Sequence, residues 1–329
     1  MDIHHLTGQE AEEQRRQHLR PDFPYAYGIS LGEWPCNRSC RMCPMHAAPP
    51  GKARFMEEAV FRRACEVVGN REVSLEISAY GEPYQHPHLD DWLPLARALC
   101  PKAHIVVATN GALLDEARCL RIVDSGIDHL SFSLDAGSPE SYKWLTGSDD
   151  YGRVCANLER LAEIKARRGA GHLRITTHII GLKELAHEFE SFVRRWSPLV
   201  DSAVVRNYGN WAGLVDANGV SPAKSQPVPE ERYPCAWLWY ATKIEPDGAV
   251  SKCFIHVTGD RNPLGNIMRE DFEAVWTGLR MKKLRGMHCR NRHAEIEHCG
   301  SCIVWSLFPH FWKKRKKWGI FPDPKGEWI

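Results

Sequence analysis

The chain lacks the features that would place it at a membrane or on a nucleic acid. Its first residues contain no basic stretch followed by an apolar run, so we expect no secretory signal peptide. No window approaches the roughly 18 uninterrupted apolar residues that a membrane span needs. An excess of one charge is also missing, because 43 basic side chains balance 41 acidic ones to a net charge of +2. The sequence therefore predicts a cytoplasmic protein whose main partner is neither a nucleic acid nor a membrane.

Hydrophobic and charged residues occur in ordinary proportions, 43% and 26%, which indicates a soluble globular fold. The 329 residues suffice for one large domain, or for one domain with a smaller appendage. Cysteine is abundant, with twelve residues. Because disulfides are rare in the cytosol, this many cysteines indicates metal or redox chemistry.

Short apolar runs alternate with amphipathic stretches over the first two thirds of the chain, a pattern typical of βα units around a parallel sheet. Six strands are expected, at Tyr25–Leu31, Val73–Ala79, His104–Thr109, His129–Leu134, Leu173–Ile180 and Ser202–Arg206. Helical segments lie between them, at Glu57–Val68, at Leu114–Val123 and from Ser138 onward. Six such units predict an α/β fold, a partial (β/α)6 barrel that is TIM-like but smaller than the closed eightfold form.

The composition changes after this barrel. Residues 221–232 contain three prolines and no apolar periodicity, which predicts a linker. Strand-like segments at Trp237–Ile244 and Ala249–Phe254 flank the turn Glu245-Pro-Asp-Gly248, a hairpin signal. The expected division is an N-terminal segment (1–24), the barrel (25–220), the linker (221–232), a small cysteine-rich C-terminal extension (233–310) and a basic, aromatic tail (311–329).

The most informative motif is the segment Cys-Asn-Arg-Ser-Cys-Arg-Met-Cys, which contains Cys36, Cys40 and Cys43. With three and then two residues between them, these thiolates can wrap one face of a cubic 4Fe–4S cluster and leave the fourth iron without a protein ligand. A cluster needs such an open iron to bind and reduce a small molecule. A tetrahedral zinc site is the alternative, with His46 as the nearby candidate for its fourth ligand.

The cysteine spacing, with Met42 just before the last cysteine, resembles the signature of the radical S-adenosylmethionine (SAM) superfamily. The resemblance implies that the open iron binds the amino and carboxylate groups of SAM, whose reductive cleavage frees a 5′-deoxyadenosyl radical. Further matches stand at the ends of predicted strands, where barrel active sites lie. They imply SAM contacts from Gly81, Glu82 and Pro83 after the second strand, Asn110 after the third, Ser133 and Asp135 at the end of the fourth, and Ile179 and Gly181 at the end of the fifth. Thr177 replaces the first glycine of the motif on the fifth strand.

A second set of cysteines follows the predicted linker. Cys253 comes five positions after Gly248, and Cys299 and Cys302 enclose two residues, a layout that resembles the SPASM and shorter twitch extensions of this superfamily. The resemblance implies that one auxiliary 4Fe–4S cluster, an electron carrier, is fully ligated by four residues: Cys235, Cys253, Cys299 and Cys302. Five cysteines are too few for the two clusters of a full SPASM extension, so the single-cluster twitch form is favoured. A structural zinc held by the same thiolates is the alternative.

Cys289 is left over if those four cysteines complete the cluster. Three roles stay open for it: a core residue, an alternative cluster ligand, or a hydrogen-atom donor that quenches a substrate radical and causes epimerisation. Arg206, at the end of the sixth strand, either hydrogen-bonds a substrate hydroxyl or carboxylate or braces the extension. The remaining cysteines stand among apolar residues of predicted helices and are expected to pack in the core; they are Cys65, Cys100, Cys119 and Cys155.

The layout of the second cysteine set resembles a twitch-type radical SAM dehydrogenase of aminoglycoside biosynthesis. The resemblance implies a radical SAM oxidoreductase (dehydrogenase) or epimerase of natural-product biosynthesis. It would abstract hydrogen from a carbinol carbon of a small polar substrate, sugar or aminocyclitol in type. A flavodoxin or ferredoxin is the expected electron donor. Two alternatives stay open: a maturase that modifies a precursor peptide, and a zinc-bound interaction module without enzymatic activity.

Overall fold

The computed structural model describes residues 22–33, 36–44, 54–209, 219–224, 232–254 and 262–307. Its framework is a single sheet with the strand order β10-β9-β8-β1-β3-β4-β5-β6-β7, with β2 (Arg54–Phe55) paired to β1. The six strands of the barrel pair in parallel with one another: β1 (Ala26–Glu33), β3 (Ser74–Tyr80), β4 (His104–Thr109), β5 (His129–Asp135), β6 (Arg174–Gly181) and β7 (Ser202–Asn207). The predicted partial α/β barrel is confirmed, and each strand begins and ends within two residues of its predicted bounds.

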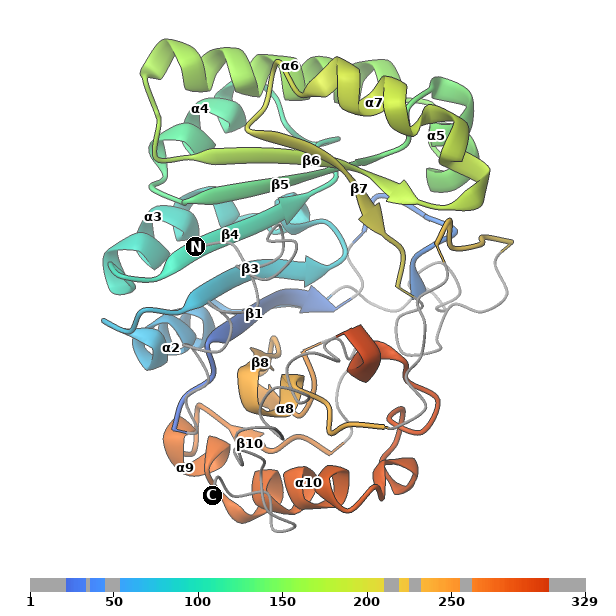
Figure 1. Cartoon of the computed structure of the whole chain (residues 1–329). Coiled ribbons are helices and arrows are strands. Elements are labelled where there is room, and N and C mark those ends of the chain that lie inside the picture. The colour runs from blue at the N-terminus through green and yellow to red at the C-terminus, as the bar shows by residue number, and fades with distance from the viewer. Residues whose placement is uncertain are drawn as a thin grey trace.

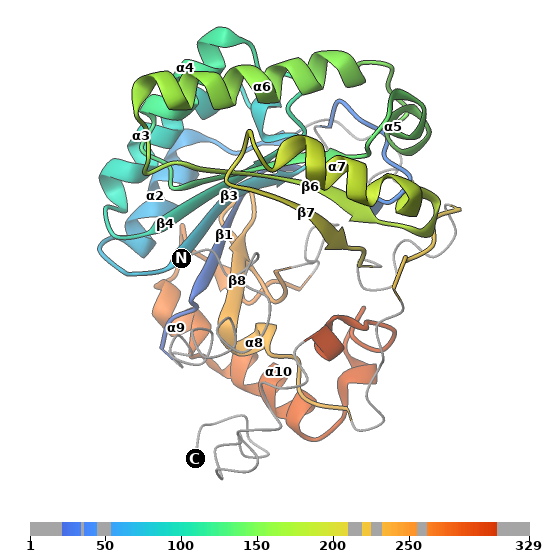
Figure 2. The same cartoon turned by 45° about the horizontal axis from the view of Figure 1, so that its top comes forward.

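Helices fill the crossovers between the parallel strands and lie along the outer side of the sheet (Figures 1 and 2). They are α2 (Glu58–Val68), α3 (Leu89–Leu99), α4 (Glu116–Asp124), α5 (Pro139–Thr146), α6 (Tyr151–Arg168) and α7 (Phe189–Trp196), with short 3-10 helices η2 (Pro83–Gln85) and η3 (Lys183–Glu188). Helix α5 begins as predicted: the Ser138 hydroxyl accepts a hydrogen bond from the Ser141 N–H, and Pro139 occupies the first turn. The sequence did not predict α3 or α7.

The strands alternate apolar and polar residues, so the sheet has two different faces. On β5, Leu130, Phe132 and Leu134 belong to the main apolar core, whereas Ser131 and Ser133 between them do not. The cysteines predicted to pack in this core are all buried in it: Cys65, Cys100, Cys119 and Cys155. None of the twelve cysteines forms a disulfide, and no helix in the described ranges has the length and apolar character of a membrane span.

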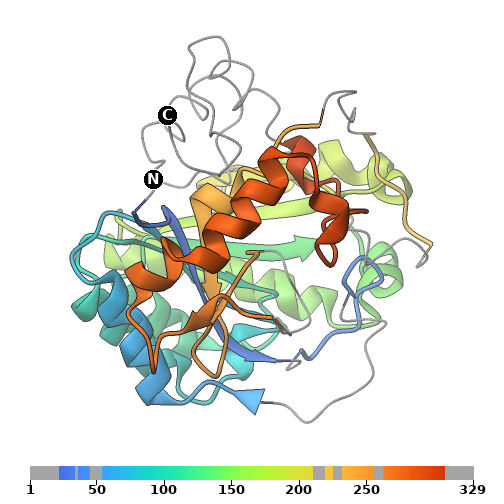
Figure 3. The same cartoon turned by 90° about the horizontal axis from the view of Figure 1, so that it is seen from below.

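The C-terminal extension continues the barrel sheet (Figures 1 and 3). Strand β8 (Ala241–Ile244) pairs in parallel with β1, and β9 (Ala249–Ser251) and β10 (Gly265–Asn266) follow it in antiparallel order. The predicted hairpin between β8 and β9 is confirmed, with Gly248 at φ +84° in its turn. The helices of this part are α8 (Trp237–Tyr240), α9 (Phe272–Trp276) and α10 (Leu279–Cys289), followed by the 3-10 turns η5 (His293–Glu295) and η6 (Val304–Leu307).

Two predicted strand bounds in the extension are wrong. Residues 237–240 form the helical turn α8 instead of strand: the N–H groups of Leu238 and Trp239 donate back to the carbonyls of Cys235 (3.2 Å) and Ala236 (3.0 Å). The buried guanidinium of Arg285 also donates from Nε to the carbonyl oxygen of Leu238 (2.9 Å). The strand predicted to reach Phe254 ends at Ser251, whose hydroxyl donates to the carbonyl of Cys253 (3.0 Å) and starts a turn. His46, residues 1–21 and the tail from residue 311 lie outside the described residues.

Candidate active site

The loop with the first three cysteines, residues 36–43, follows β1 and docks on the end of α5. The last carbonyls of a helix have no partner within the helix, and this loop supplies their donors. The N–H groups of Ser39 and Arg41 and the Arg41 Nε donate to three carbonyl oxygens of α5: Thr146 (3.3 Å), Leu145 (2.8 Å) and Trp144 (2.8 Å) respectively. The loop is therefore held on the barrel by backbone contacts on both sides of Cys40.

Arg38, inside the same loop, forms a buried ion pair with the residue that precedes α6. Its guanidinium donates to both carboxylate oxygens of Asp150, at 2.5 and 2.9 Å, and lies over the ring of Tyr142 at 5.3 Å. Burial alone raises the pKa of Asp150, but the hydrogen bonds from Arg38 and Ser148 outweigh it and lower that pKa to about 2. The pair is therefore ionised at neutral pH, and its two parallel hydrogen bonds fix the orientation of the loop.

The three loop thiols are half-buried and close enough to affect one another's ionisation. Burial raises the pKa of Cys40 well above its ordinary value, and Asp135, Cys43 and Cys36 raise it further. Burial is also the main cause of the raised pKa of Cys36. Bound iron ionises such thiols, because its positive charge offsets both effects. These three thiols are the donor set that a 4Fe–4S cluster with one open iron takes.

Glu82 joins the ends of β3 and β4 through a carboxylate that is fully buried. Its Oε1 accepts hydrogen bonds from the Thr109 hydroxyl (2.7 Å) and the Tyr84 N–H (3.1 Å), and its Oε2 accepts one from the Asn110 N–H (2.7 Å). Burial raises the pKa of this carboxyl, against the effect of these donors. Since a carboxylate has about four acceptor positions, one remains for a further donor, such as the amino group of SAM.

Asn110 extends this network to the cysteine loop. Its Nδ2 donates to the side-chain oxygen of Asn37 (2.8 Å), and its Oδ1 accepts from the Ala112 N–H (3.0 Å). Asn37 follows Cys36 directly. A continuous chain of hydrogen bonds thus runs from Glu82 through Asn110 to the residue beside the first cysteine, and it brings together three of the strand ends singled out in the sequence.

Asp135 ends β5 in a conformation that is rare for residues other than glycine, with φ +65°. The β5–β6 register shifts between Ser133 and Asp135, which marks a bulge. The Asp135 carboxylate lies 3.2 Å from Nε2 of His178 on β6, and both side chains are buried. Asp135 also raises the pKa of Cys40, so its carboxylate lies near the cysteine loop, whereas Ser133 pairs across the ladder with His178.

The structure places the other predicted SAM contacts on the same edge of the sheet, where the parallel strands end. Gly81 follows β3 at φ +137°, and Pro83 begins η2. Ile179 is fully buried in β6. Gly181 ends that strand, and a Cβ added at this position would lie only 3.0 Å from the carbonyl oxygen of Arg206. Met42 is half-buried against the core, and Arg206 is exposed on β7. Thr177, which replaces the first glycine of the family motif, donates from its hydroxyl to the Phe132 carbonyl (3.0 Å). Their contacts with SAM or substrate stay predictions.

The polar faces of the barrel strands line the inner side of the sheet, opposite the helices. The polar members are buried or half-buried: Ser30, Glu76, Ser78, His129, Ser131, Ser133, Thr176 and His178. Several pair with one another; the Ser78 hydroxyl donates to Glu76 (3.1 Å), and Nε2 of His129 lies 2.8 Å from the Thr176 hydroxyl. Where the extension joins the barrel sheet, Lys243 on β8 forms a buried ion pair with Glu245, which follows β8 (3.0 Å). Lys243 lies beside Gly28 of β1. We call these residues the polar inner face.

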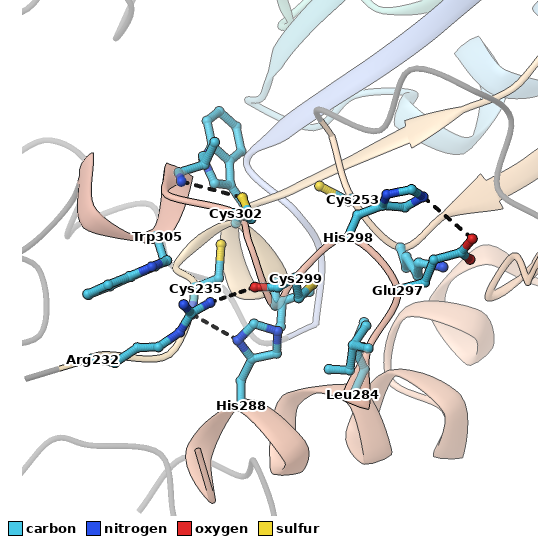
Figure 4. A pocket seen from close by; sticks show the side chains of 15 residues that line it. Arg232, Cys235, Cys253, Leu284, His288, Glu297, His298, Cys299, Cys302 and Trp305 are labelled. Atoms are coloured by element: carbon cyan, nitrogen blue, oxygen red, sulfur yellow. Dashed lines mark hydrogen bonds and ion pairs between the residues drawn. The ribbon is translucent and has the colours of Figure 1, made fainter. Parts of the chain in front are cut away.

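The four cysteines predicted to hold an auxiliary cluster line one cavity of about 50 Å³ in the extension (Figure 4): Cys235, Cys253, Cys299 and Cys302. A single water needs only about 10–15 Å³. Burial is the main cause of the raised pKa of Cys235, which lies well above its ordinary value, and of the pKa of Cys299, which is raised to about 12. Cys253 raises both pKa values further, so the thiols of Cys235 and Cys299 lie close to that of Cys253. In the described ranges no group of three or more His, Cys, Asp or Glu is placed to hold a metal ion. A 4Fe–4S cluster separates its cysteine sulfurs further than one ion does, and four thiols around a cavity fit that requirement.

Cys289 is the last residue of α10, half-buried, and packs against the main core. Its neighbour His288, and not Cys289 itself, lines the cavity of the four cysteines. Arg232 and His288 are cavity residues that the sequence did not single out, and no motif marks them. The sequence did not reveal Arg38 and Asp150 as partners either, because 112 positions separate them. The alternation of polar and apolar residues along the strands is a signal in the sequence that could have revealed the polar inner face.

Comparison with known protein families agrees with this geometry. Residues 36–195 match the radical SAM superfamily, and residues 235–303 match SPASM, an iron–sulfur cluster-binding domain. The chain therefore contains a radical SAM domain followed by a SPASM domain, which confirms the resemblance found in the sequence. Such domains carry a 4Fe–4S cluster with SAM, and an auxiliary iron–sulfur cluster.

The chain is also similar to curated relatives and to solved structures. It is 28% identical to the S-adenosyl-L-methionine-dependent 2-deoxy-scyllo-inosamine dehydrogenase of Niallia circulans over 120 residues, 35% of this chain and 48% of that protein. It is 25% identical to the PqqA peptide cyclase of Ruegeria pomeroyi over 261 residues, 69% and 68% of the two chains. The match thus spans about half the length of the dehydrogenase. The crystal structure of BtrN in complex with AdoMet and 2-DOIA shares the fold, with a TM-score of 0.58 and 18% identity over 85% of this chain and 93% of that one.

Proposed function

We propose that this protein is a radical SAM oxidoreductase that acts on a carbinol C–H bond of a small polar molecule, sugar or aminocyclitol in type. The observation that carries this proposal is the polar inner face of the barrel, which extends toward the strand ends that the cysteine loop follows. A substrate with several hydroxyl or amino groups needs many hydrogen-bond partners, because unpaired polar groups are costly in a closed site. The similarity to a dehydrogenase whose name specifies 2-deoxy-scyllo-inosamine supports the same substrate class.

Each cysteine set would hold one group. Cys36, Cys40 and Cys43 would hold the cluster that binds SAM, and the four cavity cysteines would hold the auxiliary cluster. When bound, these groups supply a 5′-deoxyadenosyl radical and a one-electron acceptor. The remaining acceptor position of Glu82 suits the SAM amino group, and Ser133 and Asp135 suit its carboxylate and ribose. The inner face would orient one C–H bond toward the radical, because a misplaced radical attacks the wrong atom.

Oxidation is favoured over epimerisation by the position of Cys289. A hydrogen-atom donor must face the substrate, whereas Cys289 ends α10 in the extension and packs against the core. Twelve cysteines without a disulfide also suit a reducing, cytoplasmic setting. A flavodoxin or ferredoxin would serve as the reductant.

The test is turnover of the anaerobically reconstituted protein with SAM, dithionite and a panel of aminocyclitols that includes 2-deoxy-scyllo-inosamine. We expect 5′-deoxyadenosine together with a ketone product, and no solvent deuterium at the reacting carbon in D₂O. Deuterium at that carbon, lost in Cys289→Ala, would instead establish epimerisation with Cys289 as the donor. If 5′-deoxyadenosine appears with none of these alcohols above the level without substrate, the substrate class is wrong.

Modification of a precursor peptide is the second candidate function. The match to the PqqA peptide cyclase covers 69% of this chain, twice the share matched by the dehydrogenase. Peptides encoded near the gene should then stimulate 5′-deoxyadenosine formation and change in mass, and aminocyclitols should not.

A further inference from the structure

Two buried hydrogen-bond donors without partners stand beside the cavity of the four cysteines. Arg232 precedes α8 and His288 lies near the end of α10, and both line this cavity (Figure 4). The Arg232 Nε and the His288 Nε2 are buried and have no hydrogen-bond partner in the structure. Because buried polar groups are nearly always paired, such atoms call for an explanation.

Arg232 is fixed in place by its other contacts. One terminal nitrogen donates to the carbonyl oxygen of Cys299 (2.8 Å), and the guanidinium lies over the ring of Trp305 at 4.8 Å. These contacts hold the positive charge beside three of the thiols, since Arg232 interacts electrostatically with Cys302, Cys235 and Cys299. They leave Nε–H as a donor with nothing to bind.

His288 has a defined tautomer. Its Nδ1 accepts a hydrogen bond from the backbone N–H of Cys235 (3.4 Å), so Nδ1 carries no proton and the ring proton is on Nε2. The buried Nε2–H is therefore a donor as well. Both orphan donors belong to residues whose other hydrogen bond goes to the backbone of a cysteine ligand, which ties their position to the cluster site.

We propose that Arg232 and His288 donate hydrogen bonds to the auxiliary iron–sulfur cluster and raise its reduction potential. Reduction adds negative charge to the cluster, and a guanidinium and an N–H dipole stabilise that charge. The inference rests on the proposed function only in that the four cysteines hold a cluster. It makes that cluster a better acceptor for an electron leaving the substrate, as an oxidation requires.

The potential of the auxiliary cluster tests this directly. Full-length protein with Cys36, Cys40 and Cys43 all changed to Ala contains the auxiliary cluster alone, so an EPR-monitored redox titration reports one centre. In this background we expect Arg232→Gln to lower the equilibrium constant for one-electron reduction about tenfold, which is about 59 mV. His288→Phe should shift the potential in the same direction. Arg292→Gln removes an exposed cation that does not line the cavity, and should change it less than twofold.

A second measurement needs no change at the cavity. Protein labelled with ¹⁵N-arginine, and separately with ¹⁵N-histidine, should show hyperfine coupling of ¹⁵N to the reduced cluster in pulsed EPR. Cluster signals without either coupling would overturn the proposal, as would unchanged potentials in both variants, and either result leaves the proposed substrate and reaction standing. Zinc in place of iron at this site would overturn the proposal together with the assignment of the cluster.

Discussion

Arg38 and Asp150 connect the loop of the first cysteines to the start of helix α6 through two parallel hydrogen bonds. The side chains are 3% and 18% exposed, so the pair is largely out of water. The contacts of the loop with α5, from Ser39 and Arg41, follow Arg38 along the chain and lie on both sides of Cys40. Residues 36–43 are therefore positioned by helices from a later part of the barrel, and the geometry of the cluster ligands depends on that packing.

Asp150→Asn should destabilise the protein by about 3 kcal/mol, because it leaves the Arg38 guanidinium buried beside a neutral partner. It should also loosen the loop and reduce iron bound at the first cluster. Urea unfolding and iron content of the anaerobic protein measure both effects. Asp149→Asn is the matched control, since this neighbour pairs with Lys143 at the surface, and should cost less than about 0.5 kcal/mol. Equal iron and stability in the two variants would contradict the role given to Arg38.

Gly111→Ala should prevent stable folding of the barrel. Gly111 has φ +71°, and a Cβ there would stand 1.9 Å from Cζ of the buried Phe132 ring. Gly169, at the end of α6, has φ +62° and nothing within 4 Å of the same position. Gly169→Ala therefore carries the backbone strain alone, about 1–2 kcal/mol, whereas Gly111→Ala adds overpacking of the core. Comparable melting temperatures of the two variants would show that the Phe132 ring can move aside at little cost in stability.

Glu82→Gln should weaken SAM binding and destabilise the strand ends. A glutamine presents an NH₂ where the carboxylate accepts from Thr109, Tyr84 and Asn110, so at least one buried donor loses its acceptor, at about 1–3 kcal/mol. The negative charge available to the SAM amino group is lost as well. Isothermal titration with SAM measures the affinity, and Glu140→Gln, an exposed change in α5, should leave it unaltered. Wild-type affinity in Glu82→Gln would remove this residue from the SAM site.

Iron analysis should separate the two cysteine sets. We expect about eight irons per chain in the intact protein, and about four when either set is changed to Ala, because each cluster holds four irons. The SAM-dependent change in the EPR signal should disappear only when Cys36, Cys40 and Cys43 are changed to Ala. Cys119→Ala, at a buried position of α4, should alter neither count. Loss of all iron on changing one set would show instead that the two sites assemble together.

The barrel was predictable from the sequence because its strands and helices follow the periodicities that burial on one face imposes. Helix α3 escaped prediction because Pro94 stands inside it; the burial of Leu89, Trp92, Leu93 and Ala96 outweighs the hydrogen bond that a proline removes. Turn α8 was not predicted, and its contact with Arg285 joins residues 47 positions apart.

The site divides in the same way. Cysteine spacing is local, so both ligand sets could be proposed from the sequence, as could Glu82 and Asn110 at strand ends. The partners of those residues could not. Asn37 meets Asn110 across 73 positions, and Arg232 reaches Cys299 across 67. Contacts of this kind follow from the tertiary packing, and a single sequence contains no period or spacing that reveals them.

The parallel ladder between β8 and β1 has a consequence for how electrons travel. Rows of backbone hydrogen bonds, from Ala26 opposite Ala241 to Ile29 opposite Ile244, make the two halves of the molecule one stiff body along this seam. The separation between the redox centres is then a property of the seam, not of the proline-rich connection. Lengthening that connection should leave tunnelling between them unchanged, whereas a proline placed in the middle of β8 should disturb it.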